Sequence, residues 1–301
     1  MKKEIKNVIL FPFNVLYKIS PKATLKALFR LKCKRRLDLE NPKSYNEKLN
    51  WLKLYYRNDL MPICADKYLA RGYITEKGYG EYLPKLLWNG SNPDDIPFDE
   101  LPDKFIIKTT SGSGNNIVCH NKTELDRADV CKKLKAMLKE KYLPCYGEWH
   151  YEQIKSQIII EELLSDGKNV VPIDYKFFCF NNLNDGDVGC IAVDLGRYVD
   201  HRRNILDAEW NFDPNVSFGF ERDLEATVEK PAKYDEMRII AKDLAKPFPH
   251  CRVDFFVIGE QFYIGELTFF NGAGFDVVSP YEYNLKMGSW INLDGIKKEE
   301  V

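Results

Sequence analysis

Two acidic residues mark the part of the chain best suited to chemistry. Asp254 lies in the apolar run from Val253 to Ile258, and Glu266 lies in the next apolar run, from Phe262 to Leu267. Gly259-Glu260 separates the runs and favours a tight turn, so the sequence predicts a β-hairpin that brings the two carboxylates side by side. Two hard oxygen ligands on neighbouring strands suit Mg²⁺ held against nucleotide phosphates. A plain hairpin with two solvated acids is the alternative.

A lysine at the end of an earlier apolar stretch is suited to hold those phosphates. The segment Phe105-Ile106-Ile107-Lys108 leads directly into a loop of small residues. In such a loop, backbone N–H groups can cover an anion beside the lysine. No GxxxxGK[ST] pattern occurs and no helix is expected directly after the loop, so this is not a P-loop. The loop residues that we expect to surround phosphate are Ser111, Gly112, Ser113 and Gly114.

Lysine, loop and acidic hairpin together resemble the ATP-grasp superfamily, ligases that join a carboxylate to an amine through an acyl phosphate. The chain is most similar to the branch named for teichuronopeptide biosynthesis, the TupA-like amidoligases of surface-polysaccharide clusters. The resemblance runs from about residue 41 to Leu293 and rests on ordered motifs. These motifs are Asn41-Pro42-Lys43-Ser44-Tyr45-Asn46-Glu47-Lys48-Leu49, Ala65-Asp66-Lys67-Tyr68, Asp174-Tyr175-Lys176-Phe177-Phe178-Cys179-Phe180 and Gly265-Glu266-Leu267-Thr268-Phe269.

The resemblance implies an α+β ATP-grasp fold in which two lobes clasp ATP. It implies that Lys67 contacts phosphate at the start of the small lobe, where an ordinary surface lysine is the alternative. The segment from Ile158 to Leu164 matches the hinge that binds adenine. There the resemblance gives Glu161 a side-chain contact to adenine and Leu163 a backbone contact, with Glu162 and Leu164 beside them.

Three further charged residues are assigned to the nucleotide. Asp174 and Lys176 lie two residues apart on an expected strand and therefore share a face. They suit the ribose hydroxyls and a phosphate respectively, or equally a mutual salt bridge. Arg252 shares a face with Asp254 in the same way. An arginine beside a metal-bound γ-phosphate can stabilise charge during phosphoryl transfer.

The chain departs from many ATP-grasp ligases at the second metal position. Where those ligases carry Glu-x-Asn, this chain has Glu266-Leu267-Thr268. We expect Thr268 to act through its hydroxyl or a water, and Asn271 is a substitute three residues further on. The resemblance implies ATP and Mg²⁺ as the bound cofactors, with one or two metal ions left open.

The expected elements divide the chain into a helical N-terminal segment (1–60), a small nucleotide-binding lobe (61–164) and a C-terminal lobe with the metal site (165–301). Ser44 with Glu47 forms a capping-box pattern for a helix to about Arg57, and Asp66 opens a helix to about Lys77. Strands are predicted near 104–109, 116–119, 157–162, 172–180 and 188–195. Helices are predicted near 124–141, 231–246 and 280–293. We expect residues 196–230 to be irregular.

Composition indicates an ordinary enzyme. The 301 residues are 45% apolar and 30% charged, enough for a full core. The formal net charge of −1 argues against nucleic acid as a partner. The eight cysteines show no CxxC spacing, which favours reduced, buried thiols.

The N-terminal part carries a concentration of positive charge. The segment from Asn7 to Ile19 is apolar but lacks the features of a signal peptide. Residues Thr24 to Arg36 form a basic amphipathic stretch that could lie weakly on an anionic membrane, or simply pack one face on the protein. We therefore expect a cytoplasmic protein, with peripheral contact at the inner face of the membrane as an open alternative.

The resemblance implies that a uronic acid of a capsule or surface polysaccharide supplies the carboxylate and that an amino acid or small amine is the nucleophile. We expect the acceptor pocket between the segment Arg197 to Arg203 and the segment Asn271 to Phe275. Arg202 and Arg203 would orient the acceptor carboxylate bidentately. The alternative is that these arginines pair with Asp194, Asp200 and Asp207 in a surface loop.

Three other functions remain open. Asp185-Gly186-Asp187 is a DxD triplet, a pattern with which many glycosyltransferases bind metal and nucleotide sugar, although a hairpin turn explains it as well. An ATP-dependent sugar kinase would use the same nucleotide site. A non-catalytic binding module would not need both phosphate-binding lysines and metal-binding acids.

Overall fold

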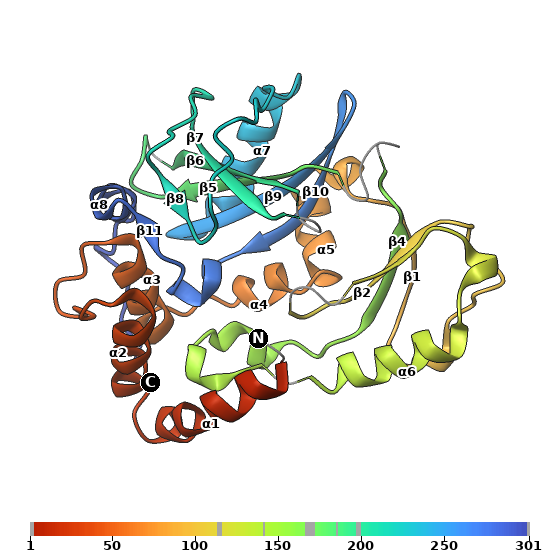
Figure 1. Cartoon of the computed structure of the whole chain (residues 1–301), viewed down its shortest axis with the longest axis horizontal. Coiled ribbons are helices and arrows are strands. Elements are labelled where there is room, and N and C mark those ends of the chain that lie inside the picture. Colours follow the sequence, from red (N-terminus) through yellow and green to blue (C-terminus); the bar gives the residue numbers. More distant parts are fainter. Residues whose placement is uncertain are drawn as a thin grey trace.

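The computed structural model describes residues 3–112, 116–140, 142–165, 172–184, 186–196 and 200–299, with side chains from residue 8 onward. Its elements form two antiparallel sheets with helices packed on them (Figure 1). In Figure 1 the smaller sheet and helix α6 lie at the right and the larger sheet lies at upper centre, with α4 and α5 between them.

The smaller sheet has four strands in the order β1-β4-β2-β3. Strand β2 alternates buried and half-buried residues, which is the pattern of a strand with one face in the core. That face packs Phe105 and Ile107 against Val130 and Leu134 of α6. The bounds are β1 (Leu86–Gly90), β2 (Phe105–Thr109), β3 (Asn116–Cys119), β4 (Ile158–Glu162) and α6 (Arg127–Leu138).

The larger sheet has five strands in the order β10-β9-β5-β6-β7. Strand β5 is buried along its whole length because both faces of the sheet are covered. Phe177 packs on Tyr234 of α7, whereas its neighbour Phe178 packs on Tyr45 of α3. The bounds are β5 (Asp174–Phe180), β6 (Asp187–Leu195), β7 (Arg202–Asp207), β9 (His250–Ile258), β10 (Gln261–Thr268), α3 (Tyr45–Tyr55) and α7 (Tyr234–Ala245).

The remaining helices extend the core of the larger sheet. Buried side chains of α2, α3, α4 and α5 belong to the same apolar cluster as β5, β6 and β9. Residues 61–83, which the sequence analysis assigned to the small lobe, therefore contribute side chains to the apolar core of the larger sheet. The boundaries between the lobes stay a proposal. The bounds are α1 (Lys3–Ile19), α2 (Pro21–Cys33), α4 (Leu60–Ala65), α5 (Leu69–Glu76), α8 (Tyr281–Ser289), β8 (Ser217–Phe218) and β11 (Val278–Ser279). Among the described residues no helix is long and apolar enough to cross a membrane.

Several local predictions are confirmed. Ser44 and Glu47 make the capping box of α3. All eight cysteines are free thiols, and six of them are buried. One prediction is wrong: the segment 196–230 is not irregular throughout, since it contains β7 and β8. Strand β7 was not predicted because it contains the polar residues Arg203 and Asn204. Such residues usually lie on the surface, but here both are buried in the sheet.

Candidate active site

On the smaller sheet, one buried carboxylate holds two cations. Glu161 of β4 accepts hydrogen bonds from Lys108 Nζ of β2 at 2.7 Å and from an Arg71 guanidinium nitrogen of α5 at 2.8 Å. Lys108 and Glu161 lie on adjacent antiparallel strands, diagonal to each other on one face. Both Glu161 oxygens accept from cations, so here Glu161 orients Lys108. Its predicted contact to adenine, like the roles of Glu162, Leu163 and Leu164 after it, stays a prediction.

Lys67 lies beside the small loop. Its backbone N–H donates to Thr110 O at 3.0 Å, and its Nζ donates to Gly112 O at 2.7 Å. The helix predicted from Asp66 begins at Leu69. The Asp66 carboxylate accepts from the backbone N–H groups of residues 68 and 69, a contact typical of a residue that caps a helix start. Burial lowers the pKa of Lys67, while the charge of Glu266 acts in the opposite direction. Of the predicted loop residues, Ser113 and Gly114 lie outside the described residues.

The predicted acidic hairpin is confirmed. Strands β9 and β10 pair with a two-residue turn at Gly259-Glu260, and Asp254 lies directly opposite Glu266. A β-bulge between Ile264 and Glu266 sets this register, which alternation of residues alone does not predict. Gly265 is needed at the bulge because a Cβ there would lie 2.8 Å from the Phe256 ring.

Arg252 lies at the centre of the hairpin site. Its guanidinium donates to both Asp254 oxygens at 2.6 and 2.7 Å, to Glu266 Oε1 at 2.9 Å and to Asn271 Oδ1. Burial disfavours its charge, but the Asp254 carboxylate outweighs burial and raises the pKa of Arg252 above its usual range. The arginine is thus a fixed cation held between the two predicted metal ligands.

A second buried cation lies on the neighbouring strand. Lys176 Nζ of β5 contacts Asp174 at 2.5 Å, Asp254 at 2.7 Å and Asp194 of β6 at 3.7 Å. Burial disfavours its charge, yet Asp174 and Asp254 raise the pKa of Lys176. The salt bridge between Asp174 and Lys176, one of the two alternatives drawn from the sequence, is present. The assignment of both residues to the nucleotide stays a prediction.

The hairpin has ligands of the type that Mg²⁺ takes, but both Asp254 oxygens accept from Arg252 and one also accepts from Lys176 in this structure. Asp254 and Glu266 offer hard carboxylate oxygens on directly paired residues, and Thr268 Oγ1 lies 3.3 Å from Glu266 Oε1. Within the described part of the chain, no three His, Cys, Asp or Glu side chains are grouped as a metal site. Water or phosphate oxygens would therefore have to complete the coordination of Mg²⁺.

One small pocket, of about 20 Å³, is lined by residues of both sheets. Its walls include Lys67, Arg71, Lys108, Glu161, Gly265 and Glu266. The predicted phosphate lysines and one predicted metal ligand therefore line the same space. Arg71 was missed from the sequence because nothing local marks its contact with Glu161, which lies on a distant strand.

The predicted acceptor arginines do not form a free cationic loop. Arg203 is buried on β7 and makes two hydrogen bonds to Asp194, at 2.6 and 3.0 Å. Burial acts to raise the pKa of Asp194, but Arg203 holds it below its usual range. Arg202 pairs with Asp200 and Glu221. The alternative drawn from the sequence, in which these arginines pair with aspartates, is therefore present for both Arg202 and Arg203. They lie on strand β7 and not in a surface loop. Arg197 lies outside the described residues.

The second acceptor segment is a tight turn fixed by α3. Gly272 and Ala273 both have left-handed backbones in the short helix η6 (Asn271–Gly274). Lys53 Nζ donates to Ala273 O at 2.7 Å, and the amides of Asn46 and Asn50 donate to Gly274 O at 3.1 and 3.0 Å. These three polar residues of α3 were missed. Their spacing along one helix face is the signal that could have identified them.

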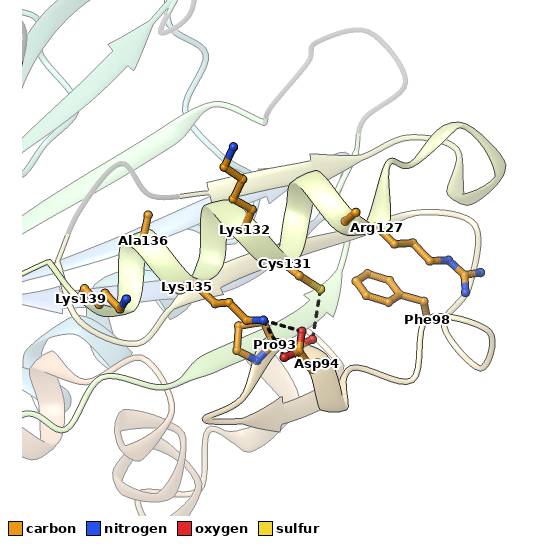
Figure 2. A pocket seen from close by; sticks show the side chains of 10 residues that line it. Pro93, Asp94, Phe98, Arg127, Cys131, Lys132, Lys135, Ala136 and Lys139 are labelled. Carbon is orange, nitrogen blue, oxygen red and sulfur yellow. Dashed lines mark hydrogen bonds and ion pairs between the residues drawn. The ribbon is translucent and has the colours of Figure 1, made fainter.

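A larger groove lies elsewhere. A groove of about 830 Å³ runs along α6 on the smaller sheet and is lined by four cationic side chains (Figure 2). In Figure 2, Lys135 points at Asp94, to which it donates at 2.6 and 2.8 Å. Arg127 pairs with Asp99. No residue predicted for the nucleotide or the metal lines this groove.

The DxD triplet lies at a hairpin turn between β5 and β6. Asp185 lies outside the described residues. Asp187 accepts from Arg238 at 3.0 and 3.1 Å and lies 3.4 Å from Lys242. Its carboxylate is therefore used to fix α7 to the larger sheet.

The comparisons with known proteins agree with this architecture. The model of the TupA-like ATP-grasp family matches residues 47–292, and the chain belongs to that family. The α+β ATP-grasp fold predicted from the sequence is thereby confirmed. No curated protein sequence matches the chain.

Similar solved structures include an L-amino acid ligase from Bacillus licheniformis. It is 14% identical with a TM-score of 0.49, over 79% of this chain and 51% of that one. The ADP complex of an N5-carboxyaminoimidazole ribonucleotide synthetase is 15% identical with a TM-score of 0.45, over 69% of this chain and 45% of that one. A D-alanine–D-alanine ligase from Helicobacter pylori is 15% identical with a TM-score of 0.46, over 84% of this chain and 70% of that one. The chain thus spans about half the length of the first two.

Proposed function

We propose that the protein is an ATP-dependent carboxylate–amine ligase that joins an amino acid or small amine to a uronic acid of a capsular or surface polysaccharide. The observation that carries the proposal is the small pocket that Lys67, Lys108 and Glu266 line together, with residues of both sheets in its walls. Cations for phosphate and an acid for Mg²⁺ thereby line one space. Membership of the TupA-like ATP-grasp family supports ATP as the phosphoryl donor.

Residues of both sheets would bind the phosphates of ATP and the Mg²⁺ ion. Lys67, Lys108 and the loop from residue 111 to 116 would hold the phosphates, and Glu161 keeps Lys108 in position. Asp254, Glu266 and Thr268 would hold Mg²⁺, which when bound neutralises phosphate charge. Arg252 is held in place by Asp254, so it offers a preorganised positive charge at the transferring phosphoryl group.

The proposed reaction has two steps. A substrate carboxylate oxygen bonds to the γ-phosphorus while the bond to the bridging oxygen breaks, which releases ADP and leaves an acyl phosphate. The amine nitrogen then bonds to the acyl carbon, the phosphate leaves with the carbon–oxygen electron pair, and the nitrogen loses a proton. A pocket closed by both sheets would keep water from the acyl phosphate.

The test is a matrix of uronates crossed with amino acids and small amines, with ATP and Mg²⁺. We expect ADP and inorganic phosphate to appear in equal amounts only when both a uronate and an amine are present. ADP release without inorganic phosphate, coupled to a phosphorylated sugar, would favour a sugar kinase instead. Turnover of a nucleotide sugar without ATP would favour a glycosyltransferase. The ion pairs of Asp187 with Arg238 and Lys242 speak against that function, because they already engage this carboxylate of the DxD triplet.

A further inference from the structure

Helix α1 exposes an apolar stripe. Val8, Phe11, Val15 and Ile19 are exposed by 74%, 66%, 45% and 77%, and they recur at helical spacing on one face. The opposite face is fixed to the protein: Leu10 is buried, and the Asn14 side chain accepts from Cys145 N at 3.0 Å. The stripe is therefore the outer face of a packed helix, and its exposure does not come from a loose end.

The segment that contains this stripe is rich in positive charge. The net charge of the whole chain is −1, yet no acidic residue occurs between Ile5 and Leu37. That segment contains nine lysines and arginines, namely Lys6, Lys18, Lys22, Lys26, Arg30, Lys32, Lys34, Arg35 and Arg36. Lys18 and Lys22 flank the end of the stripe where α1 passes into α2, and both are exposed.

We propose that α1 and the start of α2 form a docking surface for an anionic lipid bilayer, with the α1 stripe inserted among the headgroups and acyl chains and the lysines on lipid phosphates. An interfacial helix needs an apolar face beside a basic one, and both are present here. The surface would lie on the membrane and would not cross it. This inference goes beyond the proposed ligase activity and does not depend on it.

The positive charge of this segment favours an anionic lipid surface over a second copy of the chain as the binding partner of the stripe. An exposed apolar stripe can also be covered by its counterpart in a dimer. Pairing two α1 stripes would, however, bring two segments of the same high positive charge together, and like charges repel. An anionic surface attracts that charge, and each lysine or arginine near it strengthens binding severalfold.

The test is co-sedimentation of the full chain, without ATP, with vesicles of phosphatidylcholine alone or with phosphatidylglycerol added. We expect binding to the anionic vesicles that falls as salt rises. Replacing Phe11 and Val15 by serine should weaken binding by about tenfold or more, because two apolar side chains no longer leave water. Lys18→Gln, Lys22→Gln and Lys26→Gln together should weaken it by on the order of a hundredfold.

Matched controls lie on other faces of the protein. Ile239→Ser removes an apolar side chain on α7 that is 63% exposed, and Lys132→Gln with Lys139→Gln removes two exposed charges on and directly after α6. Both controls should bind vesicles as the wild type does. Binding lost equally in the controls, or no binding to anionic vesicles, would overturn the proposal. So would a dimer in solution that the Phe11 and Val15 substitutions dissociate. Unchanged ATP turnover of all variants on a soluble substrate separates this test from the ligase test.

Discussion

Two buried histidines make the fold sensitive to mild acid. His150 and His250 are 1% and 3% exposed, and burial lowers the pKa of each to about 3. His250 lies between two fixed partners, Tyr45 OH at 3.0 Å from Nε2 and Cys179 O at 2.8 Å from Nδ1. The carbonyl can only accept, so Nδ1 carries the proton and Nε2 accepts from the tyrosine. A second proton would remove that acceptor.

The lowered pKa values of the two histidines determine how the free energy of unfolding changes with pH. The folded pKa lies below the unfolded value of about 6.5, so between pH 6.5 and 3 the unfolded chain binds protons that the folded chain does not. The free energy of unfolding therefore falls as the pH falls. From pH 7 to pH 5 each histidine lowers it by about 2 kcal/mol, and the pair by about 4 kcal/mol.

The assay is urea unfolding at pH 7, 6 and 5 at constant ionic strength, for the wild type and His150→Phe. No hydrogen-bond partner is present for His150 Nδ1 in the described part of the chain, and the ring packs against Phe269 and Phe270. His150→Phe should therefore keep the fold and roughly halve the histidine contribution to the pH dependence. His120→Asn, at an exposed position, is the control. A His150→Phe variant as acid-sensitive as the wild type would refute the reasoning.

Three further predictions concern the site. Lys108→Ala and Asp254→Asn should each lower ATP turnover by about a hundredfold or more, as expected for losing one preorganised charge, while circular dichroism shows an intact fold. An ATP analogue with Mg²⁺, and not a UDP-sugar, should raise Tm in a thermal-shift titration, because a ligand of the native state stabilises it. Arg203→Ala should lower the free energy of unfolding by about 3 kcal/mol or more, since it leaves Asp194 buried without its main partner, whereas Arg202→Ala at the more exposed position should change it little.

Local sequence patterns predicted the elements that hold the candidate site residues. The hairpin of Asp254 and Glu266 and the strand that ends at Lys108 follow from apolar runs, turn residues and spacing. The bulge at Gly265 did not follow, because one inserted residue changes the pairing without changing the overall pattern.

The sequence did not predict which charged side chains form ion pairs in the folded protein, because these pairs depend on tertiary packing. Arg71 and Arg203 carry no local mark of their contacts with Glu161 and Asp194. A buried ion pair has the same composition as a surface one, so arginine and asparagine at the start of β7 indicated a loop. For this reason the sequence did not reveal the ion pairs of Arg202 and Arg203, and their contact with an acceptor carboxylate stays a prediction.

Helix α3, which begins inside the motif from Asn41 to Leu49, has a physical role that its sequence does not reveal. Asn46 and Asn50 hold the carbonyl of Gly274, and Lys53 holds that of Ala273, in a turn whose two left-handed residues need support. That turn begins at Asn271, whose side-chain oxygen accepts from Arg252 between the two predicted metal ligands. Helix α3 therefore lies outside the pocket but fixes the chain that leaves strand β10. Through Asn271 it constrains the position of the arginine, which explains why polar residues stand on a buried helix face.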